Sequence, residues 1–207
     1  MRTKWMQRAF LVIGLAALAS LAAHAQTDVA ASLYGAFSGT TTGNNITQSP
    51  SNAAGGLLEV RHIAHPWFGY EGTYAFNRAN QTYRFTIPPL CPAGTGPCGL
   101  QAVSANAHEV TGDWVASLKI SNLRPFALAG GGLLLDVPSS GQSSTSTTTK
   151  PVFVYGAGLD WGLLPHIGVR LQYRGNLYKA PDLTNLFTSS NAFTHTAEPM
   201  IGVYFRL

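Results

Sequence analysis

Charged side chains that recur at two-residue spacing beside apolar neighbours carry the clearest chemical pattern in this sequence. Those residues are Glu59, Arg61, Glu71, Glu109, Asp113, Asp160, Arg170, Arg174, Glu198 and Arg206. Because successive side chains of a strand point to opposite faces, the spacing predicts one charged face and one apolar face. Charges away from bulk water persist when they are paired and hydrogen-bonded, so the predicted chemistry is a network of buried ion pairs. We expect Arg170 and Arg174 to be its hubs, because a guanidinium can bridge two carboxylates.

Two cysteines, Cys91 and Cys98, frame the stretch CPAGTGPC. In an exported chain this pair predicts a disulfide within one loop, with free thiols or a metal site as the alternatives. Two cysteines without a nearby histidine supply half of a zinc site, so we expect neither a metal nor a cofactor. Prolines around the pair predict a stiff loop. We expect that loop to contact any extracellular ligand, which the sequence does not identify.

Histidines offer two further candidate sites. His195 and Thr196 stand near Glu198, the groups that a hydrolase of the membrane-enzyme type would need. Adjacent residues of a strand face opposite sides, however, so the sequence predicts that the chain is not an enzyme. His62 and His65 flank a short connection and have no further metal ligands nearby, which indicates a structural role.

The first 25 residues have the composition of a secretory signal peptide. Basic residues precede an apolar run, and Ala23 and Ala25 frame a cleavage site before Gln26. The run is shorter than the ~20 residues of a spanning helix, which argues against a permanent anchor. We therefore expect a cleaved segment, 1–25, followed by one domain, 26–207. Three of the 13 Lys and Arg precede Gln26, so ten remain against nine Asp and Glu. No basic run survives, which argues against nucleic acid as a partner.

The elements that must position the charges are segments of about ten residues with period-two alternation. They lie at about 28–38, 56–64, 67–77, 107–118, 125–136, 152–163, 167–178 and 196–207. The Gly-rich sequence FALAGGGLLLD leaves the register of the fifth segment open. Short connections, around 64–67, 119–125 and 163–166, alternate with long polar ones, which include the stretches 39–55 and 79–106. This alternation places all long loops at one end of an up-and-down meander.

The apolar face of these segments predicts contact with lipid. Nineteen charged residues are too few to coat a soluble barrel of this length. Aromatic residues lie on this face towards the strand ends, as in the girdles of membrane barrels. Those residues are Tyr34, Phe37, Trp67, Phe68, Trp114, Phe126, Phe153, Tyr155, Trp161 and Phe205. A barrel in lipid must close to satisfy its backbone. The predicted fold is therefore an all-β, eight-stranded antiparallel up-and-down transmembrane barrel, with long extracellular loops and short periplasmic turns.

The sequence FVYGAGLDWGLLPHIGVRLQYRGNLYKAPDL, residues 153–183, resembles the penultimate hairpin of the small outer-membrane barrels of the OmpA, OmpX and opacity-protein type. The resemblance implies a location in the outer membrane of a Gram-negative bacterium, contact with its lipid and lipopolysaccharide, and a monomer. It also implies that the last strand is recognised by the outer-membrane assembly machinery. The residues of this signal are Ile201, Val203, Tyr204, Phe205 and Leu207. Many members end on Phe, whereas this chain ends on Leu207, and we expect no peptidoglycan-binding domain after the barrel.

The lumen and the loops suggest different functions. Side chains fill a barrel of about eight strands, so the charged interior predicts a plugged, salt-bridged lumen. Function would then lie in the loops, as adhesion, surface binding or envelope integrity. The alternative is a narrow ion or small-solute channel that uses the same polar interior. A soluble, ligand-holding periplasmic barrel would need the charges on the outside instead.

Overall fold

The computed structural model describes residues 26–65, 67–85, 100–139, 145–183 and 190–207 of this 207-residue chain. The strands within these ranges are β1 (Gln26–Ser38), β2 (Thr41–Gly43), β3 (Ile46–Pro50), β4 (Ala53–His65), β5 (Phe68–Phe85), β6 (Leu100–Ser117), β7 (Leu123–Pro138), β8 (Thr148–Gly162), β9 (Ile167–Lys179) and β10 (Phe193–Arg206). Among the described residues, no helix is long and apolar enough to cross a membrane. The all-β class predicted from the sequence is confirmed.

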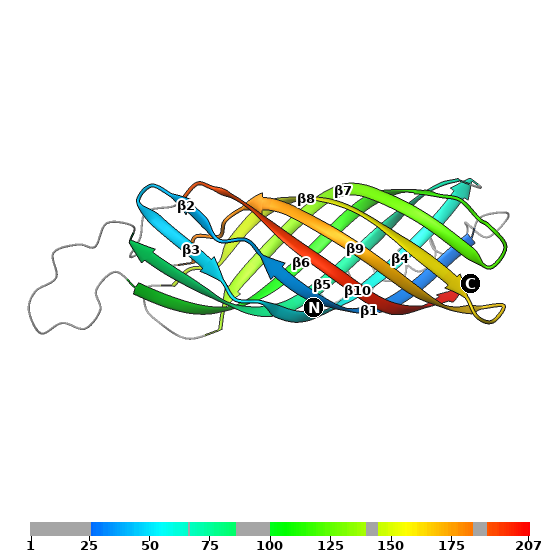
Figure 1. The fold of residues 1–207 in the computed structure, drawn as a ribbon, viewed down its shortest axis with the longest axis horizontal. Helices are drawn as coiled ribbons and strands as arrows, with labels where there is room; N and C mark the ends of the chain where they lie inside the picture. Colours follow the sequence, from blue (N-terminus) through cyan, green and yellow to red (C-terminus); the bar gives the residue numbers. More distant parts are fainter. Residues whose placement is uncertain (1–25, 66, 86–99, 140–144, 184–189) are drawn as a thin grey trace, which may run out of the picture.

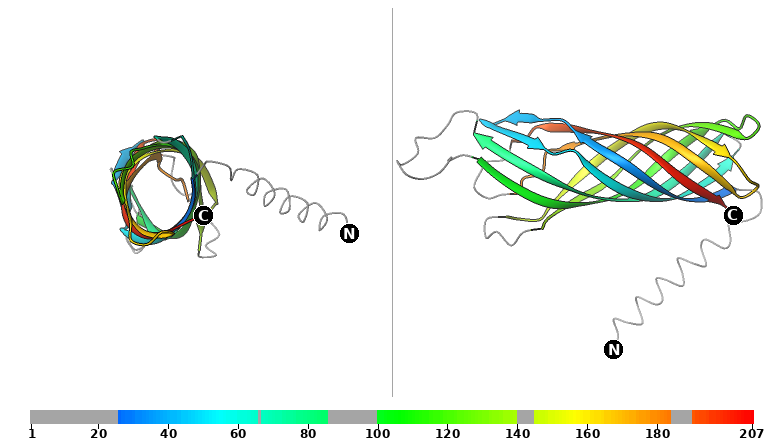
Figure 2. Two further views of the ribbon diagram at one scale, coloured as in Figure 1. Left: turned by 90° about the vertical axis from the view of Figure 1, so that its right-hand side faces the viewer. Right: turned by 60° about the horizontal axis from the view of Figure 1, so that its bottom comes forward.

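Eight of these strands, β1 and β4 to β10, close into one antiparallel barrel (Figures 1 and 2). Strand β1 pairs with both β4 and β10, and β5 pairs with both β4 and β6, so no edge of the ring is left open. The other neighbours follow chain order, which is the predicted up-and-down arrangement. The closing β1–β10 ladder runs from Asp28–Arg206 to Ser38–Thr196 and is interrupted between Tyr34–Met200 and Phe37–Ala197. The interruption includes Pro199, which has no N–H to donate.

The two remaining strands correct the prediction that residues 39–55 form only a polar loop. Strands β2 and β3 form a hairpin there, and β3 pairs with the distal part of β5, from Ile46–Phe85 to Pro50–Gln81. Strand β4 pairs with β5 only up to Gly55–Asn77, so β3 takes the place of β4 beside the longer strand. The Gly, Asn and Pro residues of this stretch are depleted in strands, which weakens its strand signal, and pairing with β5 supplies the order.

The strands are longer than predicted, at 13–18 residues in the barrel. Extension of β5 and β6 shortens the connection predicted at 79–106 to residues 86–99, and Cys91 and Cys98 lie in that segment, outside the described residues. The connections between barrel strands alternate as predicted. Residues 66–67, 118–122 and 163–166 turn at one end, and 39–52, 86–99, 139–147 and 180–192 connect at the other.

The outer face of the barrel is apolar and carries aromatic side chains towards both ends. Near the short turns lie Trp67, Tyr70, Trp114, Trp161 and Phe205, and near the long connections lie Phe37, Phe76, Phe153, Tyr155 and Phe193. Each of these side chains is at least 38% exposed, which is an unusual environment for so many aromatics in water. Two aromatic bands on an apolar wall are the girdles expected at the two interfaces of a membrane.

Two aromatic residues predicted on this outer face lie in the interior instead. Tyr34 is 5% exposed and its hydroxyl accepts a hydrogen bond from Asn77 Nδ2 at 3.1 Å. Phe126 is also 5% exposed. Tyr34 and Phe37 are three residues apart, so a regular strand must send one of them inward. Phe126 points inward on β7 because it lies two residues from both Arg124 and Leu128, which also face the lumen.

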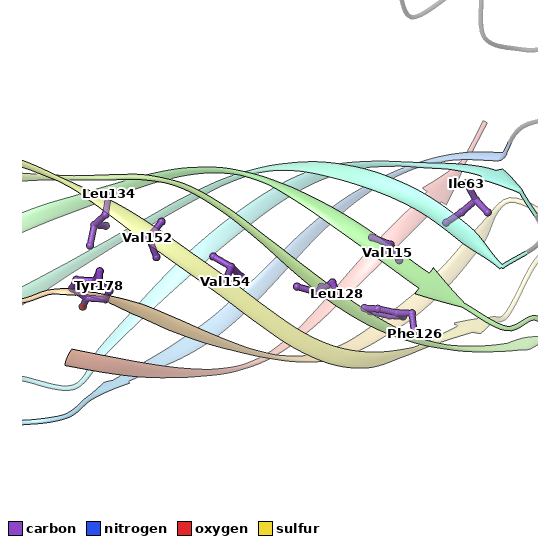
Figure 3. Packing of buried hydrophobic residues seen from close by; sticks show 8 residues of the cluster. All are labelled: Ile63, Val115, Phe126, Leu128, Leu134, Val152, Val154 and Tyr178. Atoms are coloured by element: carbon purple, nitrogen blue, oxygen red, sulfur yellow. The ribbon is translucent and has the colours of Figure 1, made fainter. Parts of the chain in front are cut away.

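The structure also settles the register of the Gly-rich strand β7. Its Leu128 and Leu134 face the lumen with Val152 and Val154 of β8, as part of an apolar inner wall (Figure 3). Gly130 lies on the same face of β7, and a Cβ at this position would overlap both the carbonyl oxygen of Gly112 and the carboxylate of Asp113 on β6. Glycine at this position therefore lets the backbone of β6 and the carboxylate of Asp113 approach β7 closely.

Removal of Phe205 to Leu207 should abolish assembly of the barrel in the outer membrane. The change deletes the pair of Phe205 with Val29 and the hydrogen bond from Leu207 N–H to Thr27, which close the ring at this end. The substitution Leu207→Phe keeps an apolar terminal residue and serves as the matched control. The readout is the amount of heat-modifiable protein in outer-membrane fractions. Normal amounts from the truncated chain would contradict the prediction.

Candidate functional site

The lumen of the barrel contains nearly all acidic side chains of the described residues. They are Asp28, Glu59, Glu71, Glu109, Asp113, Asp136, Asp160 and Glu198, none more than 5% exposed. Strict alternation along each strand places them there, since each shares its parity with other buried residues of its strand. Arg61, Arg170 and Arg174 are fully buried among them. The candidate site is therefore a charged interior inside an apolar wall.

Arg61 on β4 is the centre of a cluster of ion pairs in the half of the lumen near the short turns. Its guanidinium lies 2.6 Å from the carboxylate of Glu71 on β5 and 3.4 Å from that of Asp160 on β8. Strand β8 is not a neighbour of β4, so the second contact crosses the lumen. The guanidinium also lies 3.9 Å from the centre of the Phe126 ring, in cation–π geometry.

Arg170 on β9 completes this cluster. It donates from Nε and Nη2 to the two oxygens of Asp160, at 2.6 and 2.7 Å, and it forms an ion pair with Glu59 on β4. Two parallel charge-assisted hydrogen bonds of this kind make the Arg170–Asp160 pair a strong and geometrically specific one. Arg61 and Arg170 thus share Asp160, and together they connect β4, β5, β8 and β9.

Arg174 forms a second cluster farther along β9. Its Nη2 lies 3.2 Å from Glu109 and 3.7 Å from Asp113, both on β6. Its Nη1 donates to Thr73 Oγ1 at 3.1 Å. Asn176 Nδ2 donates to the other oxygen of Glu109 at 2.9 Å. Because β9 and β6 lie on different sides of the ring, these contacts also span the lumen.

Two residues of the predicted network are placed differently from the rest. Arg206 is at the rim, with 26% of its side chain exposed, and lies 3.5 Å from Asp28. Glu198 is 3% exposed, but no ion pair joins it to a cation within the described residues. Sequence reasoning missed three buried charges, Asp28, Arg124 and Asp136. The alternation of residues along β1 could have predicted that Asp28 faces the lumen. The positions of Arg124 and Asp136 could be predicted only once the register of β7 was known.

The charges are distributed unequally along the barrel. Near the short turns four acidic residues, Asp28, Glu59, Glu71 and Asp160, accompany four arginines, Arg61, Arg124, Arg170 and Arg206. Towards the long connections, Glu109, Asp113, Asp136 and Glu198 accompany one arginine, Arg174, and Lys150 of β8, which acts electrostatically on Asp136. One half of the lumen is balanced, and the other has an excess of carboxylates.

Residues that follow β9 cover the lumen at the end with the long connections. Leu183 is fully buried against Tyr83 and Ile46, and Pro181 accepts hydrogen bonds from Tyr83 Oη at 2.7 Å and Gln48 Nε2 at 3.1 Å. Burial raises the pKa of the Tyr83 phenol above its ordinary value, so this group remains a neutral donor. An ion pair between Lys150 Nζ and Asp182 Oδ2, 3.1 Å apart, connects the same segment to β8.

The candidate enzyme and metal groups are not brought together. His195 Nε2 lies 3.0 Å from the hydroxyl of Tyr155 on the outer face, whereas Thr196 bonds Tyr178 and Ser38 inside the barrel. The ring of His62 packs against that of Tyr70, with centres 5.1 Å apart and planes tilted by 36°. In the part of the chain that the structure describes, no group of three or more His, Cys, Asp or Glu is arranged to chelate a metal by itself.

Comparison with known proteins identifies the architecture. The family described as outer membrane protein beta-barrel domain matches residues 9–205. The structure of Ail, the attachment invasion locus protein of Yersinia pestis, in complex with the heparin analogue sucrose octasulfate, is 16% identical. It covers 89% of this chain and 100% of its own, with a TM-score of 0.54. No curated protein matches the sequence.

Two other solved barrels have the same fold. Neisserial surface protein A is 13% identical, covers 87% of this chain and 97% of its own, and has a TM-score of 0.56. The outer membrane protein OprG of Pseudomonas aeruginosa is 9% identical, covers 88% of this chain and 95% of its own, and has a TM-score of 0.58. At these identities the likeness concerns the fold.

The substitution Arg61→Met should destabilise the barrel by about 3–5 kcal/mol, the usual effect of removing one partner of a buried ion pair. It leaves Glu71 and Asp160 with less compensation in a medium of low dielectric constant. The measurement is the temperature at which the folded band on an SDS gel converts to the unfolded band. Arg78→Met is the control, because Arg78 is exposed and should matter by less than ~0.5 kcal/mol. Equal midpoints for Arg61→Met and the wild type would contradict the network.

Proposed function

Because the chain belongs to the family of outer membrane protein beta-barrel domains, and so lies in the outer membrane of a Gram-negative bacterium, we propose that it is a closed barrel that acts through its surface. In such barrels the short turns face the periplasm and the long loops face outward. On this orientation, residues 39–52, 86–99, 139–147 and 180–192 reach the outside of the cell.

The observation that carries the proposal is the set of ion pairs that cross the lumen. Arg61 to Asp160 and Arg174 to Glu109 join strands on different sides of the ring. An ion or solute that passed through would have to break these pairs in a medium of low dielectric constant, where each is costly to break. The buried Leu183 at the other end adds a second obstruction. Both features favour a structural or surface-interaction role over conduction.

The charges on the outside of the barrel favour an anionic partner. Eight of the nine acidic residues are in the lumen, and the ninth, Asp182, is paired with Lys150. The exposed charges near the long connections are therefore Arg78, Arg84 and Lys179. The segments 86–99, 140–144 and 184–189 contain no charged residue. A surface of one sign attracts polyanions, such as lipopolysaccharide phosphates or the sulfated sugar that Ail binds.

Planar-bilayer recordings test the closed lumen. The purified protein should give no resolved current steps, because the cross-lumen pairs occupy the path. A large porin inserted under the same conditions is the positive control. Regular steps that scale with salt concentration would refute closure and support the alternative of a narrow channel.

The double variant Arg78→Glu/Arg84→Glu should lose most of its retention on a heparin column and its binding to lipopolysaccharide. The expected effect is largest at low salt, since exposed charges are screened beyond ~10 Å at 0.1 M. Lys119→Glu is the matched control, because Lys119 is exposed at the end with the short turns. Equal loss in both variants would indicate a general charge effect and contradict a site near the long connections.

A further inference from the structure

A pocket opens at the end of the barrel with the short turns, which faces the viewer in the left view of Figure 2. Its volume is about 240 Å³, whereas one water molecule needs ~10–15 Å³ of such space. Residues of the turns 118–122 and 163–166 form part of its wall. The strands contribute Arg124, Asp160, Tyr204 and Arg206. The pocket therefore has room for a polyatomic group together with water.

Backbone hydrogen bonds hold the wall of this pocket in place. Gly162 N–H donates to the carbonyl of Asn122 at 2.8 Å, which connects the end of β8 to the turn before β7. The amides of Leu163 and Leu164 both donate to the carbonyl of Ile167, at 3.1 and 2.9 Å. The pocket is therefore a preformed part of the barrel, since its wall needs no contact from the long connections.

Arg124 is a buried cation of this pocket without a direct ion pair. It is 7% exposed, and none of the ion pairs within the described residues includes it. Its Nη2 donates to Gln26 Oε1 at 2.9 Å, whereas its Nε and Nη1 have no hydrogen-bond partner among the described residues. Buried donors of this kind require an acceptor. An anion beside the guanidinium would supply one.

The carboxylates that act electrostatically on Arg124 make their direct contacts with other arginines. These carboxylates are Asp28 and Asp160. Both oxygens of Asp160 accept hydrogen bonds from Arg170, and Asp28 lies 3.5 Å from Arg206. The two carboxylates therefore lower the positive potential at Arg124 without supplying the acceptor that it lacks.

The lining of the pocket carries more positive than negative side chains. The positive ones are Arg124 and Arg206 inside and Lys119 at the exposed rim, and Asp160 is the negative one among the described residues. When Asp28, the partner of Arg206, is included, three cations still face two carboxylates. Asp160 also compensates the charge of Arg170, which lies deeper in the lumen. The pocket therefore attracts anions.

We propose that this pocket binds one phosphate group through Arg124 and Arg206. Guanidinium groups form charge-assisted hydrogen bonds with phosphate oxygens, and a phosphate has enough oxygens and charge to contact two of them at once. Ser121 and Asn122 also line the pocket, and their side chains can donate to the remaining oxygens.

Two sources can supply this phosphate. Leu163 and Leu164 lie at the rim of the pocket, 51% and 62% exposed, where they can contact the acyl chains of a phospholipid. A small soluble phosphate would use the polar part of the pocket alone. On the orientation proposed above, the pocket opens towards the periplasm. It lies at the opposite end from the positive surface near the long connections, so each of the two proposals can fail without the other.

Thermal unfolding in the presence of phosphate tests the site. The protein is purified in dodecylmaltoside, freed of lipopolysaccharide and phospholipid, and heated at pH 8 in increasing concentrations of sodium glycerol phosphate, with sodium chloride to keep the ionic strength constant. A ligand at ten times its dissociation constant should raise the unfolding temperature by roughly 3–6 °C for a chain of this size. Dihexanoylphosphatidylglycerol replaces glycerol phosphate in a second series. The same rise at a lower concentration of the lipid supports a headgroup site, and a rise with glycerol phosphate at the same or lower concentration supports a soluble phosphate.

The variant Arg124→Gln/Arg206→Gln should lose the rise, because it removes both guanidinium groups from the pocket. Arg78→Gln/Arg84→Gln is the control with the same change of charge, and it should keep the rise, since these residues lie near the long connections. Loss of the rise in this control would place the phosphate on the outer surface and overturn the proposal.

A second variant tests the pocket if the first does not fold. Gly162 lines the pocket, and a Cβ there would have ordinary contacts of 3.5 Å with Asn122 O and Tyr204 Oη. Gly162→Leu should therefore fill the pocket, keep both arginines and lose the rise. A normal rise in this variant, no rise in the wild type, or an equal rise with sodium acetate would overturn the proposal.

Discussion

The backbone hydrogen bonds that join β1 to β10 are the constraint on which the rest of this structure depends. Lipid offers no partners for N–H and C=O groups, so a sheet that spans it must close. Closure brings residues 26–38 and 193–206, the two ends of the described chain, side by side (Figure 1). Closure also gives every strand an inner and an outer face, and alternate residues of the strand occupy each. The apolar exterior and the charged interior are both consequences of that one ring.

A closed ring of eight strands leaves an interior that side chains can fill, and here they are mostly charged. The cost of removing eight carboxylates from water is large, and arginines offset it only where they reach. Arg61, on β4, and Arg170, on β9, each contact more than one carboxylate. The apolar wall of β7 and β8 offers Phe126 as a surface for their guanidinium groups. Charge pairing and apolar packing therefore stabilise the same half of the lumen.

In the half of the lumen near the long connections, the carboxylates outnumber the cations. A single arginine, Arg174, accompanies four acidic residues there, and the space is covered by the segment that contains Pro181 and Leu183. Near the same end the exposed charges on the outer surface are positive. The barrel thus has a positive exterior and a negative interior within a short distance. The alternation of side chains along each strand separates the two sets of charges, because neighbouring residues face opposite sides of the wall.

The eight barrel strands and their apolar and charged faces could be predicted from the amino-acid sequence, because a period of two is a local property that each strand displays independently. The closed barrel followed from the apolar outer face, because a sheet in lipid must close. The expectations from the sequence for residues 1–25 and for Cys91 and Cys98 concern segments outside the described residues. Which charges meet depends on how the strands are arranged around the ring. Arg61 and Asp160 are 99 positions apart, and no local pattern relates them. The tertiary structure also decided the inward positions of Tyr34 and Phe126, the β2–β3 hairpin and the excess charge around Glu198, because these depend on register and on contacts across the lumen.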